Sequence, residues 1–224
     1  HADVGMSQVS FKDTVRDRVI DGYVLYPSDN TNPVQKYGEN IAFYGFDASL
    51  DGALSKKNLP LFILAHGTSG NWKNLSWLAT SLAKQGMVVT TNHPDYTTGQ
   101  ATPATIIKPW NQVKDVSFIL NEMLSGRYGK HIDKEKVFAI GYSLGGYSAM
   151  ALAGATMDLS NLVEFCNSHS DRSCTYFKPA FDTVDQTSIA ESRKSLFDHR
   201  IKAAVAIAPG YTESMSRESL AKST

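Results

Sequence analysis

The feature that most constrains this chain is the segment Gly141-Tyr142-Ser143-Leu144-Gly145, which lies between two strongly patterned runs. The apolar residues 137–140 before it predict a buried strand, and residues 144–155 after it predict a helix. Glycines on both sides of a tight strand-to-helix turn let the backbone pass close to its neighbours. We therefore expect the Ser143 hydroxyl to point out at the carboxyl end of a sheet, where it would serve as the nucleophile.

The rest of the chain alternates strand and helix patterns. Alternating apolar and polar residues predict an antiparallel strand pair and a further short strand, at 8–11, 19–26 and 41–46. Continuous apolar runs predict inner strands of a parallel sheet, covered on both faces, at 59–65, 87–90, 137–140 and 203–207. Helix-period segments occupy 72–85, 110–125 and 144–155. This order predicts an α/β fold with a mostly parallel, doubly wound sheet and antiparallel N-terminal strands.

The 224 residues, of which 42% are hydrophobic, suffice for one core, so we expect a single domain over residues 1–224. The exception to the regular alternation is an insertion at about 156–198. Connections of that length are uncommon without a role of their own. Two interpretations stay open: a flap beside the site, or an ordinary surface insertion.

The charge balance excludes several classes of partner. The chain has 22 basic and 22 acidic residues, so no overall field would attract nucleic acid or an anionic membrane. No apolar run approaches the roughly 18–20 residues of a transmembrane helix. No set of residues has the spacing of a zinc site, so neither a metal nor another cofactor is expected. A small uncharged molecule is a plausible ligand.

Cys166 and Cys174 are the only two cysteines, and they lie in a stretch that looks polar and poor in helix. They are either a local disulfide or two free thiols, and a disulfide would imply an oxidising compartment. The chain begins His1-Ala2-Asp3, as a mature chain does after removal of a signal peptide. We therefore expect a secreted or periplasmic protein.

A second segment complements Ser143. Ala65-His66-Gly67-Thr68-Ser69-Gly70 directly follows the apolar run 59–65. Acyl transfer needs two backbone N–H groups to stabilise an oxyanion, one after the nucleophile and one from a loop of this kind. Leu144 and Thr68 are the candidates. His66 and Gly67 would shape the site, with His66 as a buried histidine that orients the loop rather than a base.

These segments carry a resemblance to a known family. In order along the chain they are Arg16-Asp17-Arg18 before a strand that ends Tyr26-Pro27, His66-Gly67, Asn92-His93-Pro94-Asp95, Asp115-Val116-Ser117-Phe118 and Gly141 to Gly146. The chain resembles the secreted bacterial carboxylesterases and lipases grouped with dienelactone hydrolases and platelet-activating-factor acetylhydrolases, within the α/β-hydrolase superfamily. The resemblance implies the α/β-hydrolase fold, Ser143 as nucleophile, Thr68 and Leu144 as oxyanion hole, and a disulfide in the insertion.

The chain departs from the family pattern in its catalytic partners. The family order is Ser, Asp, His, with the last two after later strands than residues 201–208. We therefore expect the acid and the histidine on sequence after Thr224, on a C-terminal fragment or segment, and we expect the C-terminal strands to be missing from this chain.

Other candidates within the chain fit the base or acid role less well. His131 and His199 precede strands, at the wrong end of the sheet, and His169 lies on the insertion. His93 is expected to line the pocket or to donate a hydrogen bond. Glu213 follows the strand 201–208 and is expected at the pocket rim.

Two classes of function remain. The first is a serine ester hydrolase of the esterase or lipase type, which acts on a small or lipid-like ester through an acyl-serine intermediate. The aromatic residues Tyr96, Trp110 and Tyr142 suggest a substrate with an apolar acyl or alcohol group. A dienelactone is a less suitable substrate, because its hydrolysis favours a cysteine nucleophile and this sequence has a serine. The alternative is a catalytically silent binding domain or an inactive nicked fragment.

Overall fold

The computed structural model describes residues 4–29, 33–40 and 43–222. The strands are β1 (Val4–Asp13), β2 (Arg18–Pro27), β3 (Val34–Asn40), β4 (Phe43–Leu50), β5 (Leu59–Ala65), β6 (Met87–Thr91), β7 (Ile132–Tyr142) and β8 (Ala203–Ile207). The α-helices are α1 (Ser76–Leu82), α2 (Pro103–Ile106), α3 (Trp110–Ser125), α4 (Leu144–Leu152), α5 (Leu159–Ser168), α6 (Arg172–Phe177), α7 (Gln186–Ser192) and α8 (Arg217–Ala221). Three short 3-10 helices are η1 (Gly129–His131), η2 (Lys178–Thr183) and η3 (Thr212–Ser214).

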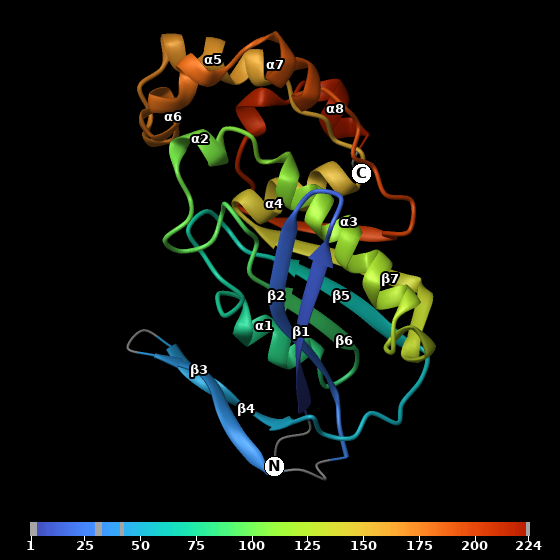
Figure 1. The fold of residues 1–224 in the computed structure, drawn as a ribbon. Coiled ribbons are helices and arrows are strands. Elements are labelled where there is room, and N and C mark those ends of the chain that lie inside the picture. The colour runs from blue at the N-terminus through green and yellow to red at the C-terminus, as the bar shows by residue number, and fades with distance from the viewer. Residues whose placement is uncertain (1–3, 30–32, 41–42, 223–224) are drawn as a thin grey trace.

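The eight strands of the described residues form one sheet in the order β3-β4-β1-β2-β6-β5-β7-β8 (Figure 1). The strands β6, β5, β7 and β8 are parallel to one another, and β1 pairs with β2 in antiparallel fashion. Parallel strands need crossover connections, and helices provide them here. The predicted combination of a parallel sheet and antiparallel N-terminal strands is therefore confirmed.

Helices cover both faces of the sheet. The larger core cluster joins α3 and α4 to one face, with Ile63, Val113 and Leu144 among its buried members. The smaller cluster lies under α1 on the other face and includes Leu64 and Ala79. Successive residues of β5 thus point into opposite cores, which is why that strand is apolar throughout.

Several boundaries differ from the sequence prediction. The segment 72–85 forms a helix only from Ser76 to Leu82, and β3 and α2 were not predicted. Residue Ile41, the predicted start of a strand, lies outside the described residues. The prediction that β8 is covered on both faces is wrong for the described residues, because β8 is the edge strand and Val205 is 51% exposed.

The insertion at 156–198 forms three α-helices and one 3-10 helix over the carboxyl end of the sheet (Figure 1). The expectation that the cysteines lie in a helix-poor stretch is wrong, because Cys166 lies in α5 and Cys174 in α6. The two are joined in a disulfide with a Cα–Cα distance of 5.1 Å. Residues 156–198 are called the flap below.

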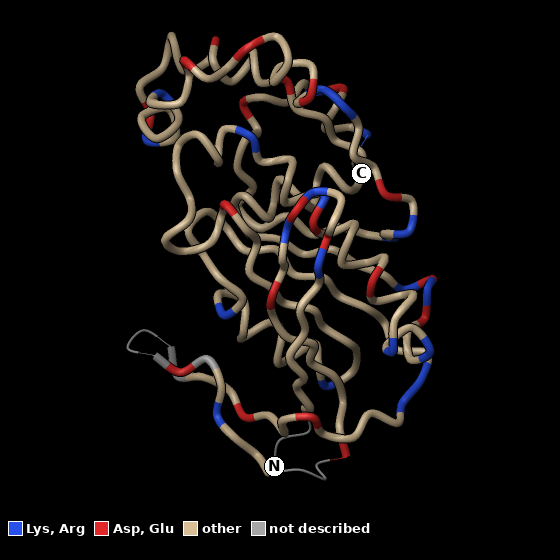
Figure 2. Tube along the Cα trace, in the orientation of Figure 1, with Lys and Arg blue, Asp and Glu red and all other residues tan. Residues whose placement is uncertain are grey.

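Charged residues of both signs are interspersed along the chain (Figure 2). Neither sign collects on one side of the trace, in keeping with the equal numbers of acidic and basic residues. The arrangement adds no electrostatic feature that would favour a polyanion.

Candidate active site

Ser143 stands at the turn between β7 and α4 with a strained backbone. Its φ is 55° and its ψ is −111°, a conformation that costs free energy and that clusters at functional sites. A Cβ on Gly141 would come within 1.9 Å of the Gly145 carbonyl oxygen, and one on Gly145 within 2.0 Å of the Ala65 carbonyl oxygen. Both positions require glycine because the turn passes so close to β5 and α4.

Backbone hydrogen bonds hold this turn against the end of β8. The Ser143 N–H donates to the Ile207 carbonyl at 3.0 Å. The Ser143 carbonyl accepts from the N–H groups of Gly210 and Tyr147, both at 3.0 Å. Three backbone hydrogen bonds thus hold Ser143 in its strained conformation, and such strain persists in a folded protein only where the surroundings hold it.

The loop after β5 approaches the turn closely. A Cβ on Gly67 would lie 3.3 Å from the Ser143 Cβ. Among the described residues, no acceptor bonds to the backbone N–H of Thr68 or to that of Leu144. Leu144 is the first residue of α4, where an N–H has no partner within the helix. Two backbone donors near Ser143 therefore have no partner among the described residues.

A buried histidine supports this loop from below. His66 accepts a hydrogen bond at Nε2 from the His93 backbone N–H, at 3.1 Å. Its proton must then be on Nδ1, which donates to the Gly67 carbonyl at 2.7 Å. Burial, together with the neighbouring His93, lowers the pKa of His66 to about 3. His66 is neutral at ordinary pH and orients the loop, as its sequence context predicted.

Beneath His66 lies a network of buried charges. Asp115 is fully buried and accepts from His93 Nδ1 at 3.1 Å and from Arg18 at 2.7 and 2.8 Å. Arg16 donates to the same carboxylate at 2.8 Å. Burial alone would raise the pKa of Asp115, but the hydrogen bonds from His93 and Arg18 lower it to about 2. The carboxylate therefore stays ionised and holds His93 in place.

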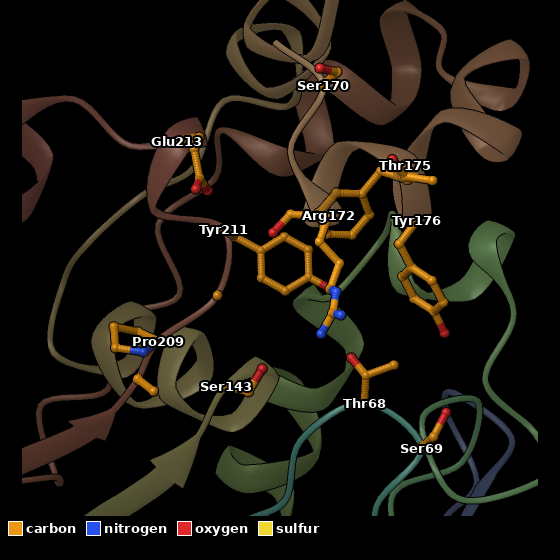
Figure 3. Close-up of a pocket in the computed structure, with 14 residues that line it drawn as sticks. Thr68, Ser69, Ser143, Ser170, Arg172, Thr175, Tyr176, Pro209, Tyr211 and Glu213 are labelled. Atoms are coloured by element: carbon orange, nitrogen blue, oxygen red, sulfur yellow. The ribbon is translucent and has the colours of Figure 1, made fainter.

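The Ser143 side chain opens onto a cavity of about 900 Å³ (Figure 3). Thr68 and Ser69 form its floor beside Ser143, and the flap and the segment after β8 form its walls. The flap residues in its lining are Ser170, Arg172, Ser173, Thr175, Tyr176 and Phe177. The residues after β8 are Ala208, Pro209, Gly210, Tyr211 and Glu213.

Tyr211 joins the flap to the core at this cavity. Its ring lies 5.2 Å, centroid to centroid, from Phe177 of the flap and 5.2 Å from Tyr147 of α4. Its hydroxyl donates to the Ile106 carbonyl at 2.6 Å. Because Tyr211 is buried, its pKa is raised well above the usual value and the hydroxyl stays protonated. These contacts favour the flap interpretation of the insertion over an uninvolved surface loop.

A second cavity of about 500 Å³ is lined by the same loop. Thr68 and Ser69 line both cavities, so the two adjoin at the loop after β5. Trp77, Tyr142 and Ile207 give the second cavity an apolar wall. The site therefore has two adjoining chambers, of which the first contains Ser143 and the second has the apolar wall.

The structure brings some predicted site residues together and sets others apart. Ser143 and Thr68 line the first cavity, and Gly67 and Tyr142 line the second. Leu144 is buried and directly follows Ser143 in the chain.

Three predicted pocket residues line neither cavity. His66, His93 and Tyr96 are 3% exposed or less and lie beneath the loop. The Tyr96 carbonyl accepts the Ser69 N–H at 2.8 Å, so Tyr96 supports the loop from behind. None of the three forms a wall of these cavities: His66 has the loop-orienting position, His93 has the hydrogen-bonding role that was the alternative to a wall, and Tyr96 is the pocket candidate that the structure moves behind the loop.

Of the candidate catalytic acids and bases within the described part of the chain, only Glu213 lies at the first cavity. Glu213 lines the first cavity, but among the described residues no histidine does. His169 stacks on Phe165 with ring centroids 4.0 Å apart, and His131 hydrogen-bonds the Lys56 carbonyl. Sequence reasoning missed Arg172 and Tyr211, which have no motif around them. The position of Arg172 between the two cysteines was the one available signal.

Within the part of the chain that the structure describes, no three His, Cys, Asp or Glu residues group as metal ligands would. No described helix combines the length and the apolar character needed to cross a bilayer.

Comparison with known proteins finds similar structures but no protein that is similar in sequence. No protein-family model matches the chain, and neither does any curated protein. A ferulic acid esterase from Streptomyces cinnamoneus superposes with a TM-score of 0.56 and 16% identity, over 66% of this chain and 54% of the esterase. An acetyl xylan esterase from Paenibacillus sp. R4 superposes with a TM-score of 0.52 and 14% identity, over 87% of this chain and 64% of that enzyme.

These likenesses establish the α/β-hydrolase fold. The matched part amounts to between half and two thirds of the length of each esterase.

Proposed function

We propose that this α/β-hydrolase chain carries the nucleophile and the oxyanion hole of a serine carboxylic-ester hydrolase of the esterase or lipase type. The observation that carries the proposal is the strained Ser143 turn, which opens on a cavity and has near it two backbone N–H groups, those of Thr68 and Leu144, with no acceptor among the described residues. The esterase names of the two structural neighbours support the same class of reaction.

The reaction would proceed in two acyl transfers. The Ser143 oxygen attacks the ester carbonyl carbon and gives up its proton to a base. The N–H groups of Thr68 and Leu144 stabilise the oxyanion, and the alcohol leaves with a proton. Water then attacks the acyl-serine ester, releases the carboxylic acid and restores the Ser143 hydroxyl. Loss of one oxyanion donor typically slows such chemistry by about a hundredfold to a thousandfold.

The proton acceptor is proposed to lie on sequence after Thr224, together with its acid partner. Two observations support this placement. Among the described residues no histidine lines the cavity with Ser143, and β8 has a partly exposed edge that could pair with a further strand. A continuation of this chain and a separate C-terminal fragment are the two forms that this part of the proposal takes.

The proposed substrate is a small-molecule or lipid-like ester. The apolar wall of the second cavity, with Trp77 and Tyr142, would take an apolar acyl or alcohol group. The disulfide in the flap supports a location outside the cytoplasm, secreted or periplasmic. No metal or other cofactor enters the proposed reaction.

The test is covalent labelling of the intact protein with a fluorophosphonate probe. We expect labelling at Ser143, and we expect Ser143→Ala to lose both labelling and ester hydrolysis with an unchanged circular dichroism spectrum. Ser170→Ala is the matched control, because Ser170 lines the same cavity from the flap. Hydrolysis that persists in Ser143→Ala would refute the proposal.

A second candidate function is a catalytically silent binding domain. The observation that favours it is the lack of a histidine among the described cavity residues. This alternative predicts no labelling of Ser143 and saturable binding of a ligand in the cavity. An inactive nicked fragment is the third possibility, and the intact mass of the isolated protein distinguishes it from the other two.

A further inference from the structure

A single cation projects into the first cavity. Arg172 is the first residue of α6, and its side chain extends from the flap toward Ser143 and Thr68 (Figure 3). The other flap residues in the lining carry hydroxyl groups or aromatic rings. The guanidinium is therefore the only positive charge in the described lining of this cavity.

No acidic side chain neutralises Arg172 within the described part of the chain. The neighbouring Asp171 carboxylate is engaged with the Cys174 N–H at 3.0 Å, where it caps α6. Glu213 lines the opposite wall, and Figure 3 shows the Tyr211 ring between its carboxylate and the guanidinium. None of the described ion pairs includes Arg172. Its five N–H donors are available to a ligand.

The disulfide fixes the segment that carries this cation. Arg172 lies inside the short loop closed by Cys166 and Cys174, which are eight residues apart and both fully buried. Asp171 also anchors this loop through its cap on α6. The backbone of Arg172 is therefore constrained on both sides, which limits how far its guanidinium can move away from the cavity.

From this arrangement we infer that the substrate carries a carboxylate, which Arg172 binds next to the ester attacked by Ser143. The planar guanidinium matches a carboxylate in a two-point hydrogen-bonded pair. One cation and one acid, Glu213, line the cavity, so a monoanion suits it better than a dianion such as a phosphate monoester. The inference names a substrate class for the site proposed above and rests on that proposal for the reaction itself.

Binding to a catalytically blocked protein tests the recognition step separately from the reaction. Calorimetric titrations of the intact Ser143→Ala protein would compare 3-phenylpropionate with its uncharged amide, 3-phenylpropanamide. We expect the carboxylate to bind about tenfold to a hundredfold more tightly than the amide, the range for a hydrogen-bonded charge pair. Arg172→Gln should bring the two affinities together, and Arg172→Lys should restore part of the difference.

Arg217→Gln is the matched control. Arg217 also begins a short helix after a capping residue and is exposed, but it does not line the cavity. The control should keep the full preference for the carboxylate. The inference is overturned if Arg172→Gln keeps the same preference for the carboxylate over the amide as the protein with Arg172. It is also overturned if the carboxylate does not bind at all. Tighter binding of phenyl phosphate than of 3-phenylpropionate would overturn the assignment to a monoanion.

Activity measurements then separate this inference from the proposed function. With Ser143 present, the ratio of kcat/KM for a carboxylate-bearing ester to that for its neutral analogue should fall about tenfold to a hundredfold in Arg172→Gln. Hydrolysis with an unchanged ratio would refute the role of Arg172 and leave the esterase proposal intact. Carboxylate binding without hydrolysis would refute the esterase proposal alone.

Discussion

Gly145 is a residue at which α4 passes close to the end of β5. An added Cβ would lie 2.0 Å from the Ala65 carbonyl oxygen, and backbone atoms cannot move aside as the end of a side chain can. We therefore predict that Gly145→Ala lowers the free energy of unfolding by about 3 kcal/mol, measured by urea denaturation.

Gly210→Ala is the control for this substitution. Gly210 also contacts the Ser143 turn, but an added Cβ there would meet no atom closer than 3.7 Å. Its stability should stay within about 0.5 kcal/mol of the unmodified protein. Equal stability of the two variants would show that the close approach at Gly145 is relieved by movement of α4.

At the residue scale, the sequence predicted what depends on local spacing. The glycines around Ser143 and the apolar run before it lie within a few residues of one another, so the local pattern is enough to predict the strand-to-helix turn. The buried charge network cannot be predicted from local spacing, because Arg18, His93 and Asp115 are far apart along the chain and meet only in the folded protein. The resemblance had picked out these same segments, but no sequence pattern showed that they lie beneath the loop.

The flap shows the same limit at the scale of elements. Its helices are short and begin at the capping aspartates Asp158, Asp171 and Asp185. Helices of this length show too few turns for a helical period to stand out. The long helix α3 was predicted with its observed ends, Trp110 and Ser125, because sixteen residues display the period clearly.

The disulfide is expected to stabilise the flap more than the sheet. Closing a loop of this length contributes about 2–3 kcal/mol through the unfolded state. We predict that Cys166→Ala with Cys174→Ala accelerates tryptic cleavage within residues 156–198, at sites such as Arg172 and Lys194. The fragments can be identified by mass spectrometry.

A second measurement checks that this effect is local. Hydrogen exchange of the β5 and β7 amides should stay close to that of the unmodified protein, because these strands lie in the sheet core and not in the flap. Unchanged cleavage of the flap in the double variant would contradict the prediction and would mean that Tyr211 and its neighbours hold the flap without the disulfide.

At the scale of the whole molecule, His66 and Asp115 couple stability to pH. The pKa of His66 is about 3 in the folded protein and 6.5 in the unfolded reference, so the unfolded chain alone takes up this proton as the pH falls through 6.5. The stabilisation is fully present above pH 6.5 and is lost progressively toward pH 3. Asp115 acts lower: its pKa is about 2 when folded and 3.8 in the reference, so its contribution is lost as the pH falls from about 3.8 toward 2.

Between pH 6 and pH 4, His66 should therefore dominate the contribution of this pair. One proton taken up only on unfolding lowers the free energy of unfolding by about 1.4 kcal/mol per pH unit. We predict that His66→Gln, whose side chain does not titrate, reduces the slope of stability against pH by about that amount in urea denaturation at pH 6, 5 and 4. The slope is the test, because repacking around glutamine changes stability by a similar amount at every pH. Equal slopes in the two proteins would mean that His66 takes up its proton in the folded state, and the loop would then lose its acceptor at Nε2 without unfolding.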